Sequence, residues 1–253
     1  MSLSLVILRA RPDLIAPIFT DPIRALWPEF MMHDAVADLY FEHGHFDRYL
    51  DLAFAIIDPQ APEAPVDRAF PVPFCLADER SVLPDARWDG VIRWAHEDQM
   101  RGRAPNMLSA LEITLLPGYR GRGNSGVSLD AVRRHAHAMG LQKLFAPVRP
   151  TAKARGPFTP IAEYAHRQSE DGLPSEPWLR IHVRAGGRII EVASTNMIIA
   201  GNLAEWRSWT GLPLAQSGAV AIPENLVPLL GSAEQDHAAY VEPNIWVEHS
   251  ILP

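Results

Sequence analysis

Residues 108–126 read LSALEITLLPGYRGRGNSG, and this stretch decides the fold. Its mostly apolar first part predicts a β-strand that ends at Pro117. A turn rich in glycine and arginine follows, and a helical pattern begins at Asn124. Glycines let backbone N–H groups approach a phosphate closely, and a helix N-terminus carries partial positive charge. The stretch therefore predicts a phosphate-binding turn between a strand and a helix.

The turn fits the dinucleotide fingerprint G-x-G-x-x-G at Gly121–Gly126. Its context differs, because Pro-Gly-Tyr-Arg separates it from the strand and no series of βαβ units follows. About 20 residues later, where a ribose-binding carboxylate is expected, the chain has Pro147-Val148-Arg149. An arginine suits the 2′-phosphate of NADP, so an NADP-dependent oxidoreductase is kept as a third hypothesis.

The turn also approaches the nucleotide P-loop pattern G-x-x-x-x-G-K-[ST] over Gly118–Ser125. Asn124 stands where the lysine belongs, and an amide does not supply the charge that contacts the β- and γ-phosphates. The P-loop interpretation is therefore rejected.

The third pattern is R-x-x-G-x-[GA], which Arg120–Ser125 fits with Ser125 as a small-residue departure. Here the match extends outward, and Leu111–Gly123 resembles the fourth strand and pyrophosphate loop of the GCN5-related N-acetyltransferase (GNAT) superfamily. The resemblance implies an α+β fold, with a twisted, mixed, mostly antiparallel sheet flanked by helices. An amphipathic helix with Gly140 at its C′ position and an apolar run over 141–148 complete the expected central unit.

The resemblance also implies a coenzyme site. Acyl-coenzyme A is expected along the strand, with its pyrophosphate on the backbone amides of the loop. The N–H of Leu115 or Leu116 is expected to polarise the thioester carbonyl. The implied coenzyme-binding residues are Leu115, Leu116, Pro117, Arg120, Gly121, Arg122, Gly123, Asn124 and Ser125. Acetyl-coenzyme A is the expected co-substrate, and no metal is expected.

A second stretch, Ile181–Ile190, resembles the later family segment in which a helix runs straight into a strand. In that segment a tyrosine near the coenzyme sulfur is often the general acid for the departing thiolate. His182 stands at its place, and the family's Gly-Phe pair is replaced by Gly186-Gly187. The resemblance therefore gives His182 as the second catalytic candidate.

Acyl transfer to an amine needs a base, because an alkylamine with a pKa near 10 is protonated at neutral pH. Glu112 is the candidate, since it lies on the motif strand upstream of the loop. In some family members a glutamate on this strand is the base. The alternative is a strand residue that alternation directs away from the core.

The composition of the chain limits the class of protein to which it can belong. The 253 residues carry a net charge of −7 with 47% hydrophobic and 21% charged residues, typical of a soluble globular protein and not of a nucleic-acid binder. A single cysteine, Cys75, excludes an intramolecular disulfide and a cysteine metal cluster. No apolar run approaches 18 residues and no signal-peptide pattern is visible, so we expect no membrane span and a cytoplasmic location.

We expect one GNAT-like domain over 1–253, with its acyl-coenzyme A-binding unit at 108–148. Insertions are expected at roughly 58–105 and 149–177, and C-terminal strands over 187–253. Because prolines at 59, 62, 65, 71 and 73 interrupt it, the segment 58–73 is predicted to be a loop. Helices are predicted near 85–102 and 161–167, and the segment 13–46 has a mostly helical pattern.

The sequence thus predicts an acyltransferase that moves an acetyl or other short acyl group from coenzyme A to an amine acceptor by direct attack. The acceptor is a small molecule or a peptide, and a homodimer is left open. The alternative is an acyl-coenzyme A-binding sensor or scaffold domain without turnover, because the tyrosine is lost.

Overall fold

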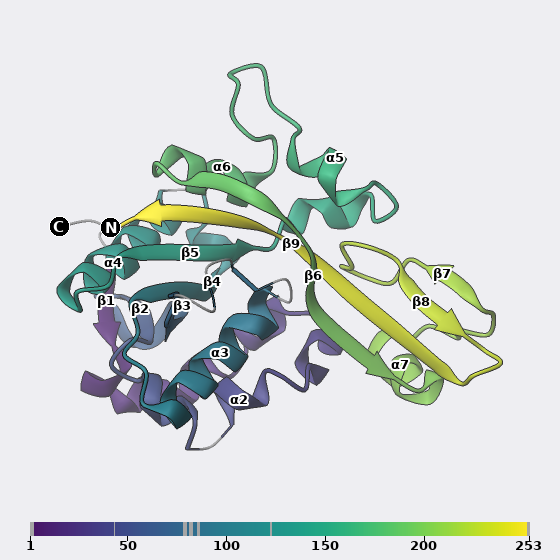
Figure 1. Ribbon diagram of the computed structural model, residues 1–253, viewed down its shortest axis with the longest axis horizontal. Helices are drawn as coiled ribbons and strands as arrows, with labels where there is room; N and C mark the ends of the chain where they lie inside the picture. Colours follow the sequence, from purple (N-terminus) through teal and green to yellow (C-terminus); the bar gives the residue numbers. More distant parts are fainter. Residues whose placement is uncertain are drawn as a thin grey trace.

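The computed structural model describes residues 3–42, 44–77, 80, 83–84, 87–121 and 123–251. Their strands form one nine-stranded sheet in the order β1-β2-β3-β4-β5-β9-β8-β7, with β6 along the other side of β9 (Figure 1). Only β4 and β5 pair in parallel among these strands. The strands are β1 (Ser4–Ile7), β2 (Phe54–Asp58), β3 (Ala61–Phe74), β4 (Met107–Leu115), β5 (Lys143–Val148), β6 (Arg188–Gly201), β7 (Gly218–Val220), β8 (Leu229–Ser232) and β9 (His237–Ser250).

This mostly antiparallel sheet confirms the α+β prediction. It also excludes the dinucleotide-binding hypothesis, since that fold requires a doubly wound parallel sheet. The helices are α1 (Ile15–Ile18), α2 (Asp38–Phe41), α3 (Arg87–Arg101), α4 (Asn124–Ala138), α5 (Ile161–Ala165), α6 (Pro177–Arg184) and α7 (Leu203–Thr210). Single 3₁₀ turns are η1 (Leu8–Ala10), η2 (Pro12–Leu14), η3 (Arg24–Leu26), η4 (Glu29–His33), η5 (Phe46–Tyr49), η7 (Pro117–Tyr119) and η8 (Thr151–Arg155).

The helices cover the two faces of the sheet separately. On one face, the rings of Phe19, just after α1, and Phe41 of α2 pack on Phe70 of β3, with ring centroids 5.5 Å and 5.4 Å away. On the other face, the Ser128 hydroxyl of α4 donates a hydrogen bond to Asp67 of β3, and α6 lies beside α4 (Figure 1).

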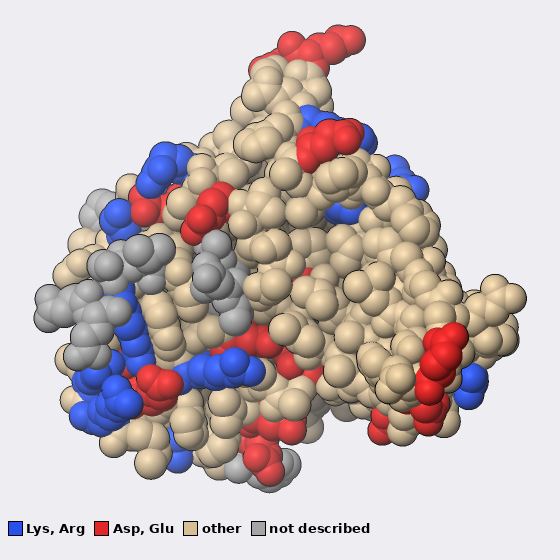
Figure 2. Space-filling view, turned by 45° about the vertical axis from the view of Figure 1, so that its right-hand side comes forward, with Lys and Arg blue, Asp and Glu red and all other residues tan. Residues whose placement is uncertain are grey.

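On the surface in Figure 2, Lys and Arg side chains are interspersed with Asp and Glu.

The prediction of a loop over 58–73 is wrong, because β3 runs through this segment and pairs with β2 and β4. The pairing of β3 with β2 ends at Ala69, so Pro71 and Pro73 pair only with β4. A proline has no N–H to donate and is accepted where one side of a strand has no partner. The sequence shows the prolines but not the place where the neighbouring strand ends.

The N-terminal segment 13–46 is built from α1, α2 and short 3₁₀ turns and contains no long helix among its described residues. Proline interrupts it at 17, 22 and 28, which prevents continuous helical hydrogen bonding. Its aromatic side chains nevertheless pack on the sheet, with Tyr40 fully buried and its hydroxyl donating to Pro71 O at 2.9 Å. The segment therefore forms a wall over one face of β3 and β4.

The central unit follows the prediction closely. Helix α4 begins after Gly123, which has a φ of 79°, and Gly140 follows its C-terminus with a φ of 73°. Both are left-handed conformations that favour glycine. The predicted helices near 85–102 and 161–167 are present as α3 and α5, with residues 85 and 86 outside the described part.

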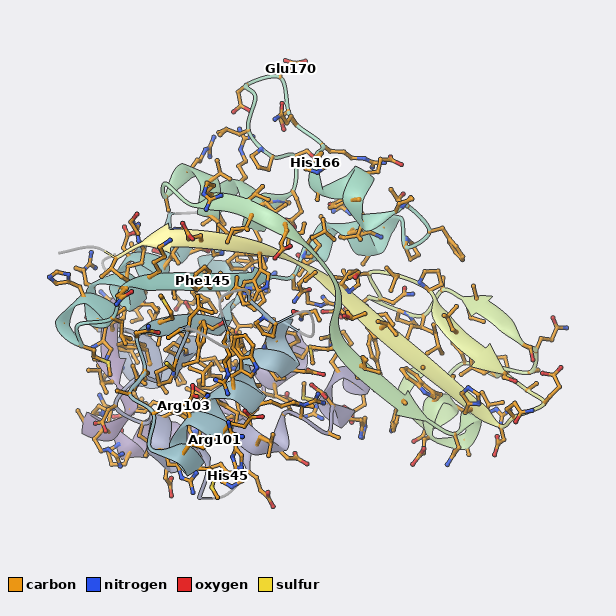
Figure 3. The ribbon with its side chains drawn as sticks, in the orientation of Figure 1. His45, Arg101, Arg103, Phe145, His166 and Glu170 are labelled. Atoms are coloured by element: carbon orange, nitrogen blue, oxygen red, sulfur yellow. The ribbon has the colours of Figure 1, made fainter. Side chains whose placement is uncertain are left out.

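Strands β4 and β5 separate toward their C-terminal ends. Their pairing runs only from Met107 opposite Lys143 to Ser109 opposite Phe145. Phe145, labelled on β5 in Figure 3, thus marks the last paired position. Just beyond it the pairing of β4 with β3 shifts register, so that Phe70 faces Glu112 and Pro71 faces Ala110. This β-bulge at Leu111 bends β4 and opens a gap in the middle of the sheet.

Candidate active site

A cavity of about 600 Å³ occupies the gap between the two strands. Residues 110–115 line one side and residues 146–149 line the other. The N-terminal wall contributes Phe19, Trp27 and Phe41, and the opposite layer contributes Trp178 and His182. The cavity therefore receives side chains from both faces of the sheet.

Glu112 is held rigidly with one oxygen left free. Three groups donate to its Oε1: Arg68 Nε at 2.5 Å, Thr114 Oγ1 at 2.8 Å and Trp27 Nε1 at 3.1 Å. Oε2 has no hydrogen bond among the described residues and is not sealed from solvent. Because Glu112 lines the cavity, this second oxygen is the one available to a bound molecule.

The amides at the end of β4 differ in their availability. Leu116 N–H donates to Val66 O on β3 at 3.0 Å, so it is already used. Successive N–H groups of a strand point to opposite sides, which directs Leu115 N–H away from β3 and toward the gap. The Leu115 carbonyl on that side accepts from Arg120 Nε at 2.7 Å. Leu115 is thus the amide of the two that remains available to a carbonyl oxygen.

The loop after β4 presents a cluster of free amides. The N–H groups of Gly121, Gly123, Asn124 and Ser125 have no acceptor among the described residues. Gly121 and Gly123 adopt positive φ values of 75° and 79°, which turn the backbone toward the N-terminus of α4. Pro117 begins η7, and the Asn124 side chain closes the loop by donating to Tyr119 O at 2.9 Å. Arg122 lies outside the described residues.

His182 forms a buried pair with His249 of β9. Its Nδ1 lies 2.8 Å from His249 Nε2, and the two residues are 6% and 0% exposed. Burial lowers the pKa of His182 to about 3, and the neighbouring His249 adds to the effect. Burial also lowers the pKa of His249 to about 4, with the charge of Arg133 second. Both rings are therefore neutral at pH 7.

The structure brings the two catalytic candidates to one cavity from opposite faces. The Glu112 side chain is on the face of β4 that the N-terminal wall covers. Glu112 lies opposite Phe70 in the pairing of β3 with β4, and its carboxylate accepts a hydrogen bond from Trp27. His182 comes from α6, on the face that carries α4. A group bound in the gap between β4 and β5 would thus lie between a carboxylate and an imidazole.

The contacts that hold the two catalytic candidates were not predicted from the sequence. Trp27 and Arg68 fix Glu112, and His249 pairs with His182, yet all three are distant in sequence from the residues they contact. Arg149, considered above for a 2′-phosphate, instead pairs with the fully buried Glu242, with Nε 3.0 Å from Oε1. These roles depend on contacts between segments that are far apart in the sequence.

Two acidic residues at the cavity have no ion-pair partner within the described part of the chain. Asp38 begins α2, and Glu224 lies in the loop between β7 and β8. Both line the cavity and both are exposed. They would attract a cationic group at the cavity mouth.

No group of three potential metal-ligating side chains occurs within the described residues. His45 and His96 form an edge-on contact, with their ring centroids 5.6 Å apart. Asp98 accepts from Arg80 NH1 at 2.7 Å as part of a buried structural network. Among the described helices, none is long and apolar enough to cross a membrane.

Comparisons with known proteins agree with this geometry. The chain is 30% identical to arginine N-acetyltransferase avaD from Aspergillus versicolor over 269 aligned residues, which cover 96% of this chain and 92% of that protein. The chain belongs to the GCN5-related N-acetyltransferase superfamily. It is thus an acyl-coenzyme A-dependent enzyme that transfers an acyl group to an amine. No family model matches the chain.

One solved GNAT-like domain supports the fold. The loading GNATL domain of CurA from Lyngbya majuscula superposes with a TM-score of 0.58 at 16% identity, covering 99% of this chain and 98% of that one. The GNAT-like decarboxylase GphF in complex with isobutyryl-CoA gives a TM-score of 0.49 at 13% identity, with both chains fully covered.

Proposed function

We propose that this GNAT enzyme transfers an acetyl group, or another short acyl group, from coenzyme A to a small cationic amine such as arginine. One observation carries the proposal. Glu112 Oε2 and the His182 ring enter the same cavity from opposite faces, with the free amide of Leu115 in the gap between the strands. This arrangement suits an amine on one side of a thioester and a leaving sulfur on the other.

The coenzyme has a continuous path through these groups. Its pyrophosphate would accept from the free amides of Gly121, Gly123, Asn124 and Ser125, with α4 contributing the positive end of its dipole. Its pantetheine arm would follow β4 into the gap, and Leu115 N–H would donate to the thioester carbonyl. These amides have no acceptor among the described residues, which supports this placement. The proposal involves no metal.

The reaction would be a direct displacement. Glu112 Oε2 removes a proton from the acceptor ammonium, and the neutral nitrogen then attacks the thioester carbon. The C–N bond forms and a tetrahedral oxyanion develops next to Leu115 N–H. The C–S bond then breaks, the nitrogen loses its second proton to water, and the coenzyme leaves as a thiolate that takes up a proton.

The acceptor is proposed to be cationic for two reasons. Asp38 and Glu224 line the cavity mouth without ion-pair partners in the described part of the chain. The relative that is 30% identical over most of both chains is an arginine N-acetyltransferase. Arginine also has a size that suits a cavity of about 600 Å³, which favours a small molecule over a peptide.

We also propose that the chain is one domain, because one sheet connects its first described strand to its last. The segment that contains β3 would then belong to the core and would not be an insertion. The proposal is consistent with the wall of residues 13–46, which packs directly on β3.

The test is acetyl-coenzyme A-dependent thiol release with arginine, compared for the native enzyme and Glu112→Gln. The glutamine oxygen keeps the acceptor position that Arg68, Trp27 and Thr114 use, while its NH₂ replaces the free Oε2. We expect turnover to fall by about 10²–10⁴-fold with coenzyme binding unchanged. Glu97→Gln, at a half-exposed side chain outside the cavity, is the matched control.

Citrulline, offered in place of arginine, tests whether the acceptor must carry a positively charged side chain. It has the length of arginine and keeps the α-amine but lacks the guanidinium charge, so it should be acetylated less efficiently. Native turnover by Glu112→Gln would contradict the assigned base, and equal efficiency for arginine and citrulline would contradict a cationic acceptor site.

A further inference from the structure

We propose that His249 is a positioning residue that holds His182 as the neutral tautomer with its proton on Nε2, directed into the cavity. In this state His182 donates a hydrogen bond to the departing coenzyme thiolate. The catalytic part of this inference rests on the proposed function, whereas the tautomer follows from the protein alone.

The two rings are connected through one nitrogen each. His182 Nδ1 and His249 Nε2 lie 2.8 Å apart, so one of them donates to the other. His249 Nδ1 is sealed from solvent and has no partner. His182 Nε2 has no partner among the described residues either, but it is not sealed, and His182 lines the cavity.

The sealed nitrogen determines the direction of the hydrogen bond. If His182 Nδ1 were the donor, the neutral His249 ring would carry its proton on Nδ1. That N–H would then be buried without an acceptor, which is costly and rare in proteins. If His249 Nε2 is the donor, Nδ1 carries only a lone pair. His182 Nδ1 then accepts, and its proton must sit on Nε2.

The surroundings keep this pair neutral. The pKa of each ring is lowered by burial, to about 3 for His182 and about 4 for His249. Arg133 of α4 adds positive charge near His249, while its own guanidinium donates to Ser250 O and Ala185 O. His182 is therefore a neutral donor at pH 7 and not an imidazolium acid.

Gly187 makes the close approach of the rings possible. A Cβ at this position would lie 2.5 Å from His249 Cε1 and 2.8 Å from His249 Nε2. No side-chain carbon fits there while His249 keeps its place. The glycine that replaces the family's phenylalanine thus has a structural partner in the His249 ring, 62 residues further along the chain.

A neutral Nε2–H next to the leaving sulfur would favour the transition state without giving up its proton. As the C–S bond breaks, negative charge grows on sulfur, and a donor that is already oriented stabilises this charge. The proton that the sulfur finally binds comes from water. His182 thereby replaces the family tyrosine as a hydrogen-bond donor at the same point of the helix.

The first test reads the tautomer directly. Two-bond ¹H–¹⁵N correlation spectra of the ¹⁵N-histidine-labelled enzyme at pH 7 distinguish a protonated ring nitrogen from a bare one. His182→Gln and His249→Gln assign the signals. We expect the proton on Nε2 in both rings. A His182 ring protonated on Nδ1, or on both nitrogens, would overturn the proposal.

The second test separates positioning from a general structural role. His249→Phe removes the donor, and we expect kcat to fall about 10-fold or more while KM for acetyl-coenzyme A is unchanged. His249→Gln, which keeps an N–H donor, should recover most of the loss. In a His182→Phe background, His249→Phe should cost nothing further, because its effect passes through His182.

The outcomes distinguish the tautomer of His182 from the catalytic role of the histidine pair. The predicted tautomer with full activity of His249→Phe would overturn the catalytic role of the pair. An equal loss from His249→Phe with and without His182 would show a structural role only and would overturn it as well. Absence of turnover with every amine tested, with the tautomer as predicted, would contradict the proposed function and leave the tautomer assignment standing.

Discussion

Replacing Gly187 with alanine tests the histidine pair through one added methyl group. The new Cβ would lie 2.5 Å from His249 Cε1 and 2.7 Å from the backbone oxygen of His182. Because carbon contacts are optimal at about 3.5–4.0 Å, the His249 ring must move by roughly 1 Å. Overpacking of this kind costs about 1–3 kcal/mol, and the lost hydrogen bond adds about 1 kcal/mol.

Thermal unfolding and thiol release together measure the consequence. At this chain length, the combined cost corresponds to a Tm lower by roughly 5–15 °C. Thiol release should slow as well, because His182 loses the partner that fixes it, while coenzyme binding at the loop is unchanged. Gly126→Ala is the control, since nothing lies within 4 Å of its Cβ and its φ is not positive. Unchanged Tm and turnover in Gly187→Ala would refute the close pairing of the rings.

Three further predictions concern other parts of the site and core. Gly123→Ala places a side chain at a φ of 79°, at a conformational cost of about 1–2 kcal/mol. The altered loop should therefore bind acetyl-coenzyme A less tightly, which calorimetry measures. Unchanged affinity would contradict the assignment of this loop to the coenzyme. Arg68→Met leaves the buried Glu112 without its counter-ion and should lower the free energy of unfolding by about 3–5 kcal/mol in urea titrations, whereas a loss below about 1 kcal/mol would show that the pair is unimportant. Burial, and next to it the charge of Asp34, raises the pKa of Asp89 to about 8. The folded state therefore binds the Asp89 proton more tightly than the unfolded chain does. The contribution of Asp89 to the free energy of unfolding should fall as the pH rises from about 4 to about 8. Asp89→Asn should flatten this part of the profile, and an unaltered profile would contradict the assignment.

The central unit of the fold was predictable because its signals are local. An apolar strand, a glycine-rich turn and an amphipathic helix are each read within a few residues, and β4, α4 and β5 appear where these patterns place them. For α6 and β6 the prediction came from the resemblance of Ile181–Ile190 to a family segment, and the structure has a helix that runs into a strand at this place.

The course of β3 and the hydrogen bonds around the site residues depend on contacts that no local sequence pattern shows. Pro71 and Pro73 are allowed in β3 because its pairing with β2 stops at Ala69, and where the neighbouring strand stops is not visible in the local sequence. Glu112 was predicted as the base, but two of the three donors to its Oε1, Trp27 and Arg68, come from distant segments. His249 lies 67 residues from His182, and Gly187 is the single sequence signal of their pairing.

The most direct test of acyl transfer to arginine is the reaction of the native enzyme with acetyl-coenzyme A and arginine, followed by free thiol and by product mass. We expect one thiol to be released per acetylated arginine, and little thiol to be released without the amine. Tight binding of the coenzyme without amine-dependent thiol release would contradict this expectation, because the cavity between β4 and β5 would then hold the coenzyme without transferring its acyl group.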